Sequence, residues 1–508
     1  MSGKSIRDMS LKADASNESY RQILRSTTIL GGASFINIVL RILRTKFLAI
    51  LLGPSGIGLW AIFNSIAEVA GAVAAMGIDS SGVKRVAEAA GSREQEKLSR
   101  TIHALRRAIW CLGVGGMIPV ILLSPLISQF TFGNEEHSFE IMLLSILIVC
   151  GTIMNGEIAI IQGMRRVGDL AKVNIFGALG GTLLAVPIVY VWGQKGVVPS
   201  LIAVSGISLL STWWYARKIE VTRVRMAWVE VWSEVKPVLT LGAAVMGSVF
   251  VYRGTPYLVN VLVTRRIGLE AVGLLQAATV LSSIYVGFII DSMGKDYLPR
   301  LSAIASDDAA CNKLVNEQLK MAMLIAVPGI VATLTFAPLI LQVFYSSDFI
   351  AAFEILRWQI MGILLQVASW PIFSILLAKG YGKLFFATFA ISNTLYIGLA
   401  VVGISYAGLN GAGMAFLGMW AFYAVIIYSI AKYLTGFTCS SANARVALVT
   451  FPAVGGVFIS GFLFDPFWSM IIGGTMLIAM AFYSIKSLLG IMGSGGLVPF
   501  LRSSKAHV

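Results

Sequence analysis

The ten residues "LGPSGIGLWA", at positions 52–61, recur as "IGLEAVGLLQ" at positions 267–276, an offset of 215 residues. The same offset aligns Arg85 of "GVKRVAEAA" with Arg300 of "DYLPRLSAI" without a gap. Further matches pair "SPLISQF" (124–130) with "APLILQV" (337–343), "FEIML" (139–143) with "FEILR" (353–357), and "WGQKG" (192–196) with "AGLNG" (407–411). Because chance similarity of apolar segments does not keep register through polar loops, the sequence predicts an internal duplication.

The duplicated segments lie in a strongly apolar chain. Of its 508 residues, 57% are hydrophobic and 13% are charged, whereas soluble domains carry about 25% charged residues. Apolar runs of about 20 residues recur from end to end, as membrane-crossing helices require, and the alternating segments of a membrane barrel are not visible. The sequence therefore predicts an all-α polytopic membrane protein. We expect fourteen transmembrane helices, at about 23–51, 56–78, 104–130, 139–162, 173–193, 197–216, 237–263, 268–291, 318–345, 355–378, 384–406, 411–433, 446–463 and 467–489.

The repeat predicts two parallel six-helix halves. An even number of helices in each half gives both the same orientation, as in many secondary transporters that carry substrate between their halves by alternating access. Most of the 39 Lys and Arg residues fall in or beside alternate loops, and the positive-inside rule then predicts that both termini are cytoplasmic. We expect a cytoplasmic tail (1–22), the first half (23–216), a cytoplasmic linker (217–236), the second half (237–433), two extra helices (434–489) and a cytoplasmic tail (490–508).

The predicted helix 23–51 carries cations where lipid would penalise them. In "NIVLRILRTKFLAILLG" (37–53), Arg41, Arg44 and Lys46 lie within six residues. A cation at the centre of a lipid-exposed helix costs about 2.5–3.5 kcal/mol, so such residues usually face a cavity. Arg41 and Arg44 are three residues apart and share one helix face. Snorkelling to the external headgroups remains an alternative for Arg44 and Lys46.

Arg253 lies near the middle of the predicted helix 237–263, the repeat partner of helix 23–51. Arginine on both helices predicts a cationic cavity between the halves. A guanidinium binds phosphate oxygens in bidentate fashion and keeps its proton, so the sequence favours an anionic substrate. Further cavity candidates, for which a structural role remains the alternative, are Tyr252, Tyr257, Asn260, Trp60 and Arg357.

Two acidic residues also fall within predicted helices. Glu68 lies near the centre of helix 56–78, and Glu157 lies in the inner half of helix 139–162. Carboxylates inside a membrane protein can take up and release protons during transport. Both residues are therefore candidates for proton coupling, and a structural ion pair with an arginine is equally compatible with the sequence.

The sequence lacks the motifs of ATP-driven pumps, metalloproteins and enzymes. It has no GxxxxGK[ST] loop, and its four cysteines and three histidines are scattered. The predicted external loops are too short to hold the active site of a glycosyltransferase. The net charge of +14 follows the loop pattern of a membrane protein. We therefore expect a transporter and not an enzyme, with no cofactor, no metal ion and no nucleic-acid partner.

Three stretches resemble a known family. "LGPSGIGLWAIFNSI" (52–66) resembles the start of the second helix in Wzx polysaccharide flippases, and "MGKDYLPRLSAIASD" (293–307) resembles the inner end of their eighth helix. "FEILRWQIMGILLQVASWPIFSILLAKG" (353–380) is similar to the tenth helix of O-antigen and enterobacterial common antigen translocases. The resemblance covers nearly the whole chain. It points to the polysaccharide transport branch of the multidrug/oligosaccharidyl-lipid/polysaccharide exporter superfamily.

The resemblance implies a flippase of the bacterial inner membrane. Such a protein moves an undecaprenyl-pyrophosphate-linked oligosaccharide, for example an O-antigen or common-antigen unit, from the cytoplasmic to the periplasmic leaflet. Polysaccharide polymerase and chain-length proteins are its implied partners, besides membrane lipid. Lipid II flippases of the superfamily carry an essential arginine shortly before the glycine that ends their first helix, and aligning that glycine with Gly53 selects Arg44. We expect Arg44, Arg253 and Arg41 to bind the pyrophosphate.

The chain departs from the antigen translocases at two places. It reads "GILLQ" (362–366) where they often carry "GDxLK", and Phe389 where some carry an acid. A coupling mechanism based on those acids therefore does not transfer. Three alternatives remain. They are a cation-coupled multidrug exporter of the same superfamily, a membrane glycosyltransferase or polymerase, and a non-transporting assembly partner of the polysaccharide machinery.

Overall fold

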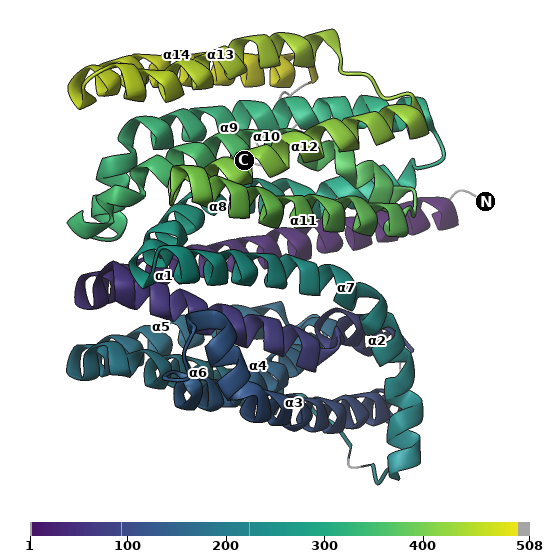
Figure 1. The fold of residues 1–508 in the computed structure, drawn as a ribbon. Coiled ribbons are helices and arrows are strands. Elements are labelled where there is room, and N and C mark those ends of the chain that lie inside the picture. Colours follow the sequence, from purple (N-terminus) through teal and green to yellow (C-terminus); the bar gives the residue numbers. More distant parts are fainter. Residues whose placement is uncertain (1–2, 93, 223, 496–508) are drawn as a thin grey trace. The chain divides into compact units, whose positions relative to one another are not determined.

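The structure is a computed structural model that describes residues 3–92, 94–222 and 224–495. Every regular element in this part of the chain is helical, and no strand occurs among the described residues, which confirms the predicted all-α class. The chain forms two compact units, residues 1–257 and 258–508, which are described in turn (Figure 1). Residues 496–508 of the predicted C-terminal tail lie outside the described residues.

The first unit contains α1 to α6 and most of α7. Its first helix, α1, runs over Gly3–Ala75; it covers the predicted helix 23–51, and it ends three residues before the predicted end of helix 56–78. It breaks at Gly53, whose φ of 63° suits glycine, and Pro54 follows without an N–H to donate. The other elements are α2 (Ile78–Gly91), α3 (Gln95–Phe132), α4 (Ser138–Gly163), α5 (Val167–Trp192), η1 (Gly193–Gly196), α6 (Val197–Ala216) and α7 (Trp228–Arg266).

Two helical segments of this unit differ from the predicted spans. The helix α2 was not predicted because it is amphipathic and too short to cross a membrane. The helix α7 begins at Trp228 rather than at residue 237, because Val231, Val235 and Val238 recur at helical spacing among charged residues. These valines share a buried apolar cluster with Val86 of α2 and with residues of α3. The start of α7 is therefore packed on α2 and α3.

The helix α7 crosses the junction between α1 and α2 with direct backbone contact. A Cβ on Gly242 would lie 2.0 Å from the carbonyl oxygen of Met76. A Cβ on Gly77, where φ is 69°, would lie 2.6 Å from the Cα of Gly242. Nearby, the Arg85 guanidinium lies 3.0 Å from the Glu234 carboxylate. Glycine at both crossing positions lets the two backbones touch.

The second unit contains the end of α7 and all later helices. Its centre is α10, which is buried along most of its length and packs against α8, α9 and α12. The Tyr297 hydroxyl of α8 donates a hydrogen bond to the carbonyl of Pro371 on α10, at 2.8 Å. The helices α13 and α14 pack on each other and on α9 (Figure 1). The elements are α8 (Leu269–Ala303), α9 (Asp308–Phe344), η2 (Ser347–Ala352), α10 (Phe353–Ala378), α11 (Gly382–Ala407), α12 (Asn410–Thr435), α13 (Ser441–Leu463) and α14 (Pro466–Gly495).

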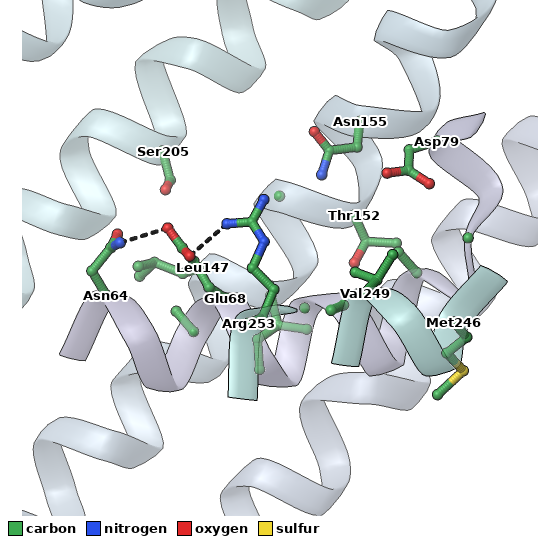
Figure 2. Close-up of a pocket in the computed structure, with 17 residues that line it drawn as sticks. Asn64, Glu68, Asp79, Leu147, Thr152, Asn155, Ser205, Met246, Val249 and Arg253 are labelled. Atoms are coloured by element: carbon green, nitrogen blue, oxygen red, sulfur yellow. Dashed lines mark hydrogen bonds and ion pairs between the residues drawn. The ribbon is translucent and has the colours of Figure 1, made fainter. Parts of the chain in front are cut away.

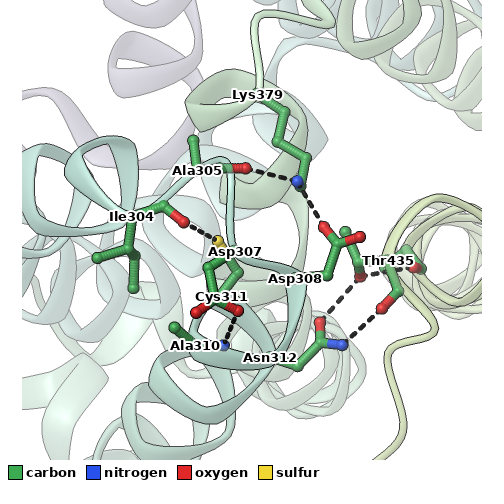
Figure 3. Close-up of polar contacts among 10 residues, drawn as sticks. Ile304, Ala305, Asp307, Asp308, Ala310, Cys311, Asn312, Lys379 and Thr435 are labelled. Atoms are coloured by element: carbon green, nitrogen blue, oxygen red, sulfur yellow. Dashed lines mark hydrogen bonds and ion pairs between the residues drawn. The ribbon is translucent and has the colours of Figure 1, made fainter.

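A polar cluster joins ends of α9, α10 and α12 within the second unit (Figure 3). The Lys379 ammonium lies 2.6 Å from Oδ1 of Asp308 and donates a hydrogen bond to the carbonyl of Ala305, also at 2.6 Å. The Asn312 amide donates to the Thr435 carbonyl at 2.7 Å and accepts from the Thr435 hydroxyl at 2.8 Å. These contacts give partners to polar groups where the apolar helices end.

The described helices are those of a multi-pass membrane protein. Ten are long and apolar enough to cross a membrane, and the count is eleven if α7, which bends by 52° between Ala243 and Met246, is one crossing. The helix α8 contributes a shorter apolar segment, Leu269–Ile284. A hydrocarbon core of about 30 Å requires about 20 helical residues, a length that each of the ten reaches or exceeds.

Candidate functional site

The first unit contains a polar cavity of about 250 Å³ (Figure 2). Its walls come from α1 beyond Gly53, from α2, α4 and α6, and from α7 beyond its bend. Ligand sites usually measure about 300–1,000 Å³, so this cavity can hold a small charged group but cannot enclose an oligosaccharide. Its polar lining residues are Asn64, Glu68, Asp79, Thr152, Asn155, Ser205 and Arg253.

Arg253 and Glu68 form the ion pair at the centre of this cavity. Nη1 of Arg253 lies 2.5 Å from Oε2 of Glu68, and the Asn64 amide donates to Oε1 of Glu68 at 2.8 Å. Both charged side chains are 42% exposed, so a ligand can reach them. Figure 2 shows the other terminal nitrogen of Arg253 pointing away from Glu68, on the side of Asn155. A guanidinium has five N–H donors, so Arg253 can hold Glu68 and still donate to a second anion.

Contacts along α7 fix the position of Arg253. The Tyr257 hydroxyl, one turn further along α7, lies 2.8 Å from the Thr131 hydroxyl at the end of α3. Before Arg253, the crossing at Gly242 holds α7 on the α1–α2 junction. Tyr252 is exposed, and its ring lies 5.9 Å from the guanidinium carbon of Arg253, within cation–π range. The helix α7 is therefore anchored on both sides of the arginine.

Glu157 lies outside this cavity and pairs with Arg106. The pair is bidentate, with Nε to Oε1 at 2.8 Å and Nη2 to Oε2 at 3.0 Å. Arg106 also donates to the carbonyl of Ala216 at 3.2 Å. Since Glu157 is buried, this group braces α3 against α4 and the end of α6. Of the two acids predicted for proton coupling, the structure therefore brings Glu68 to Arg253 and Glu157 to Arg106.

Arg41 and Arg44 do not line the cavity, and neither does Trp60. Arg44 is half-buried against α5 at Gly181, where a Cβ would lie 3.2 Å from Nη1 of the arginine. The Thr182 hydroxyl of α5 donates to the carbonyl of Leu40 at 3.4 Å, which holds this part of α1 on α5. Arg41 is exposed, and Trp60 is half-buried. Among the described residues, no hydrogen bond or ion pair engages the guanidinium group of Arg41 or that of Arg44.

The remaining candidates, Asn260 and Arg357, belong to the second unit. Asn260 is buried, and its carbonyl accepts a hydrogen bond from the Thr264 hydroxyl at 2.8 Å. Arg357 is 1% exposed and lies 3.5 Å from Oε1 of Glu354. It also donates to the carbonyl of Phe458, and the Phe462 ring centroid lies 3.9 Å from its guanidinium carbon. Arg357 therefore fastens α10 to α13.

Several cavity residues were not predicted from the sequence. Asn64 precedes Glu68 by one helical turn, so its role as a partner could have been inferred from the i,i+4 spacing. Asp79 follows the predicted helix 56–78 and resembles any acid at a helix end. Thr152 and Ser205 are small polar residues within long apolar helices, and nothing in their sequence context distinguishes them.

Comparison with known proteins places the chain in a family. The model of the family described as "Polysaccharide biosynthesis protein" matches residues 47–354, a range that contains every residue of the cavity. The chain belongs to this polysaccharide biosynthesis protein family. The predicted resemblance to Wzx-type polysaccharide flippases is thereby confirmed. As a polysaccharide biosynthesis protein with these apolar helices, the chain is a multi-pass protein of the inner membrane.

Similar proteins include named transporters. A lipid III flippase from Escherichia coli (strain K12) is 24% identical over 346 residues, which cover 66% of this polysaccharide biosynthesis protein and 80% of the relative. A putative O-antigen transporter from Shigella flexneri is 24% identical over 348 residues, with the same coverage of both chains. Among solved structures, lipid II flippase MurJ in an inward closed conformation matches with a TM-score of 0.69. That match has 15% identity and covers 91% of this chain and 100% of MurJ, so it shows a common fold.

Proposed function

We propose that this polysaccharide biosynthesis protein is a flippase for a lipid-linked oligosaccharide. It moves an undecaprenyl-pyrophosphate-linked glycan, such as an O-antigen or common-antigen repeat unit, from the cytoplasmic to the periplasmic leaflet by alternating access. The observation that carries the proposal is Arg253, an accessible arginine in a polar cavity whose present partner is a carboxylate on another helix. The names of the flippase and transporter relatives support the same conclusion.

In this proposal, Arg253 binds the pyrophosphate by releasing its present partner, the Glu68 carboxylate. Pyrophosphate presents several oxygens to a guanidinium in a planar, bidentate arrangement and therefore competes with the single oxygen of Glu68. The cavity of about 250 Å³ suits the pyrophosphate and leaves the sugars and the lipid tail outside it. Fixed N–H donors replace the water that the anion loses, which lowers the main barrier to crossing the bilayer.

Glu68 is the proposed coupling residue. When pyrophosphate displaces it from Arg253, Glu68 keeps the hydrogen bond from Asn64 and no other bond to a described residue, and the proposal assigns it the proton that moves against the substrate. Glu157 is retained as a second candidate, although it is buried and already paired with Arg106. Arg44 and Arg41 enter the proposal as further pyrophosphate ligands on the strength of the resemblance and of their lack of a described partner. They would bind in a conformation in which α1 beyond Leu40 has moved.

Fourteen crossings are proposed for the membrane topology. The 40-residue helix Ile36–Ala75 and the 50-residue segment Val167–Ala216 are each long enough to cross twice, with turns at Gly53 and at η1. With α7 and the apolar part of α8, the other eight candidate helices complete the count. The proposed organisation keeps the halves 23–216 and 237–433, the linker 217–236, the extra helices 434–489 and cytoplasmic termini. Polysaccharide polymerase and chain-length proteins are proposed to act on the flipped glycan.

The test measures flipping in inverted membrane vesicles loaded with a fluorescent undecaprenyl-pyrophosphate oligosaccharide. The fraction of label that a membrane-impermeant quencher reaches reports the leaflet. We expect the double variant R44A/R253A to lose flipping, and the charge-matched control R445A/K383A, which changes two exposed residues, to retain it. Flipping at the normal rate by R44A/R253A would overturn the proposal.

A second candidate, a cation-coupled multidrug exporter, is favoured by one observation. Two acids, Glu68 and Asp79, and one arginine are among the described residues that line the cavity, and acids attract cationic drugs. Efflux of a fluorescent organic cation from cells that express the protein separates the two functions. Under the flippase proposal, efflux equals that of cells without the protein.

A further inference from the structure

A second concave site lies on the first unit, between α5 and α6. It is an apolar groove of about 450 Å³, and its side chains are largely exposed. A groove of this size and apolar lining leaves room for a hydrocarbon chain between the side chains. The principal residues lining it are Phe176, Leu179, Leu183, Ile207, Leu210 and Trp214.

One end of this groove is ringed by cations. The guanidinium carbon of Arg217 lies 3.6 Å from the Trp214 ring centroid. The Lys218 ammonium lies 4.6 Å from the Tyr215 ring centroid, and the Lys172 ammonium lies 5.9 Å from the same ring. Within the described part of the chain, no acidic side chain pairs with any of these three cations. The groove therefore begins at a positively charged rim built on two of its own aromatic residues.

The groove faces away from the polar cavity. At 100° per residue, Ile207, Leu210 and Trp214 lie roughly 200°, 140° and 180° around α6 from Ser205, which lines the cavity. The groove also runs from Phe176 to Leu183 on α5, roughly 10 Å of helix, which is less than one leaflet of a 30 Å hydrocarbon core. A ligand of this groove would therefore lie within one leaflet, on the side of α6 opposite the polar cavity.

We propose that this groove binds an anionic glycerophospholipid. The phosphate lies among Lys172, Arg217 and Lys218, and one acyl chain lies along the groove. Basic residues close to a membrane surface attract anionic lipids, and indole and phenol rings favour the depth of the headgroups. The groove is shorter than one leaflet, and it lies on the face of α6 opposite the polar cavity. Both features favour a phospholipid over the polyprenyl tail of a transported substrate.

The first test uses Trp214 as a reporter in the full-length protein. The protein is reconstituted in phosphatidylcholine bilayers that contain an equal mole fraction of brominated phosphatidylglycerol or brominated phosphatidylcholine. Bromine quenches nearby indole fluorescence, so we expect stronger quenching by phosphatidylglycerol, and most of this difference to vanish in W214F. Equal quenching by the two lipids, or an unchanged difference in W214F, would overturn the proposal.

The second test removes the rim charges. Each Lys near an anionic surface contributes about fivefold to binding, so K172Q/K218Q should weaken phosphatidylglycerol binding about 30-fold. The control K97Q/K236Q removes the same charge from exposed positions on α3 and α7 and should bind normally. An equal loss of phosphatidylglycerol binding in both variants would show that the effect comes from net charge, and it would overturn the proposed site. Displacement of brominated phosphatidylglycerol by polyprenyl phosphate, more readily than by unlabelled phosphatidylglycerol, would assign the groove to the substrate tail instead.

Discussion

The guanidinium of Arg253 and the carboxylate of Glu68 lie 2.5 Å apart, although 185 positions separate the two residues in the chain. The pair joins α7 to the part of α1 that follows Gly53. An anionic ligand that enters the cavity therefore meets an arginine that already has a partner, and binding requires an exchange of partners. Under the proposed function, the substrate and the Glu68 carboxylate compete for one cation, and we expect Glu68 to influence the affinity for the substrate.

Replacement of Glu68 by glutamine should raise the affinity of the protein for pyrophosphate. The neutral amide releases Arg253, and an accessible ion pair contributes up to about 1 kcal/mol, so we expect up to about fivefold tighter binding. Titration of the purified protein with undecaprenyl pyrophosphate measures the affinity. D79N is the matched control, since Asp79 lines the same cavity without pairing to Arg253. An equal gain in affinity in the two variants would indicate an effect of net charge rather than an exchange of partners at Arg253.

Replacement of Glu157 by alanine should destabilise the protein. The variant leaves Arg106 without its buried partner, which typically costs about 3 kcal/mol. Replacing both residues by leucine should recover most of this loss in stability, because two leucines bury no charge that needs a partner. Thermal unfolding in detergent measures the difference. If E157A is as stable as the natural chain, the pair is not a brace.

Alanine at Gly461 should displace Arg357. A Cβ at this position would lie 2.6 Å from a guanidinium nitrogen of the buried arginine, so either the guanidinium or α13 must shift. We expect a loss of about 1–3 kcal/mol in the free energy of unfolding. G455A on the same helix is the control, because nothing lies within 4 Å of its added Cβ and alanine favours helix. Comparable stabilities of G461A and G455A would contradict the packing role of Arg357.

Alanine at Gly242 should separate α7 from the α1–α2 junction. The added Cβ would lie 2.0 Å from the carbonyl oxygen of Met76, which belongs to the backbone and cannot rotate away. We expect a loss of about 1–3 kcal/mol in stability and slower flipping, since α7 also carries Arg253. G254A should be nearly neutral in stability, because its Cβ meets only a ring atom of Phe250 at 4.0 Å. The two variants are compared by thermal unfolding and by the vesicle assay.

Stability at alkaline pH should depend on Lys379. The Asp308 carboxylate accepts a hydrogen bond from the Lys379 ammonium and raises the pKa of that lysine above its ordinary value (Figure 3). A raised pKa in the folded state adds stability that is fully present below the unfolded pKa of about 10.4 and is lost as pH rises through the folded pKa. Unfolding temperatures measured from neutral pH upward should therefore fall less steeply for K379Q than for the natural chain. K383Q, which changes an exposed lysine on α11, should follow the natural chain.

Helices were predictable from this sequence more readily than the partners of its charged residues. An apolar run such as 139–162 determines a helix by itself, and α4 forms at Ser138–Gly163. The helix α2 was not predicted because its apolar face packs against α3, α4 and α7 rather than against lipid. The cost of burying Arg357 indicated that it needs partners, but the carbonyl of Phe458 and the Phe462 ring are supplied by tertiary packing. For the same reason, only the fold reveals the partners of three further arginines. Arg253 pairs with Glu68, Arg106 pairs with Glu157, and Arg44 lies against Gly181.

The residues that contact Arg357 are synthesised at different times. The carbonyl that accepts its hydrogen bond is 101 residues further along the chain, on α13. At about 5–20 residues per second, synthesis delivers that segment roughly 5–20 s after Arg357 has left the ribosome. During this interval, Glu354 is the neighbour able to pair with the arginine, and the insertion machinery or water must cover the rest of it. A chain truncated before Ser441 would keep that exposed cation permanently, and a membrane quality-control protease could recognise it as an unfinished protein.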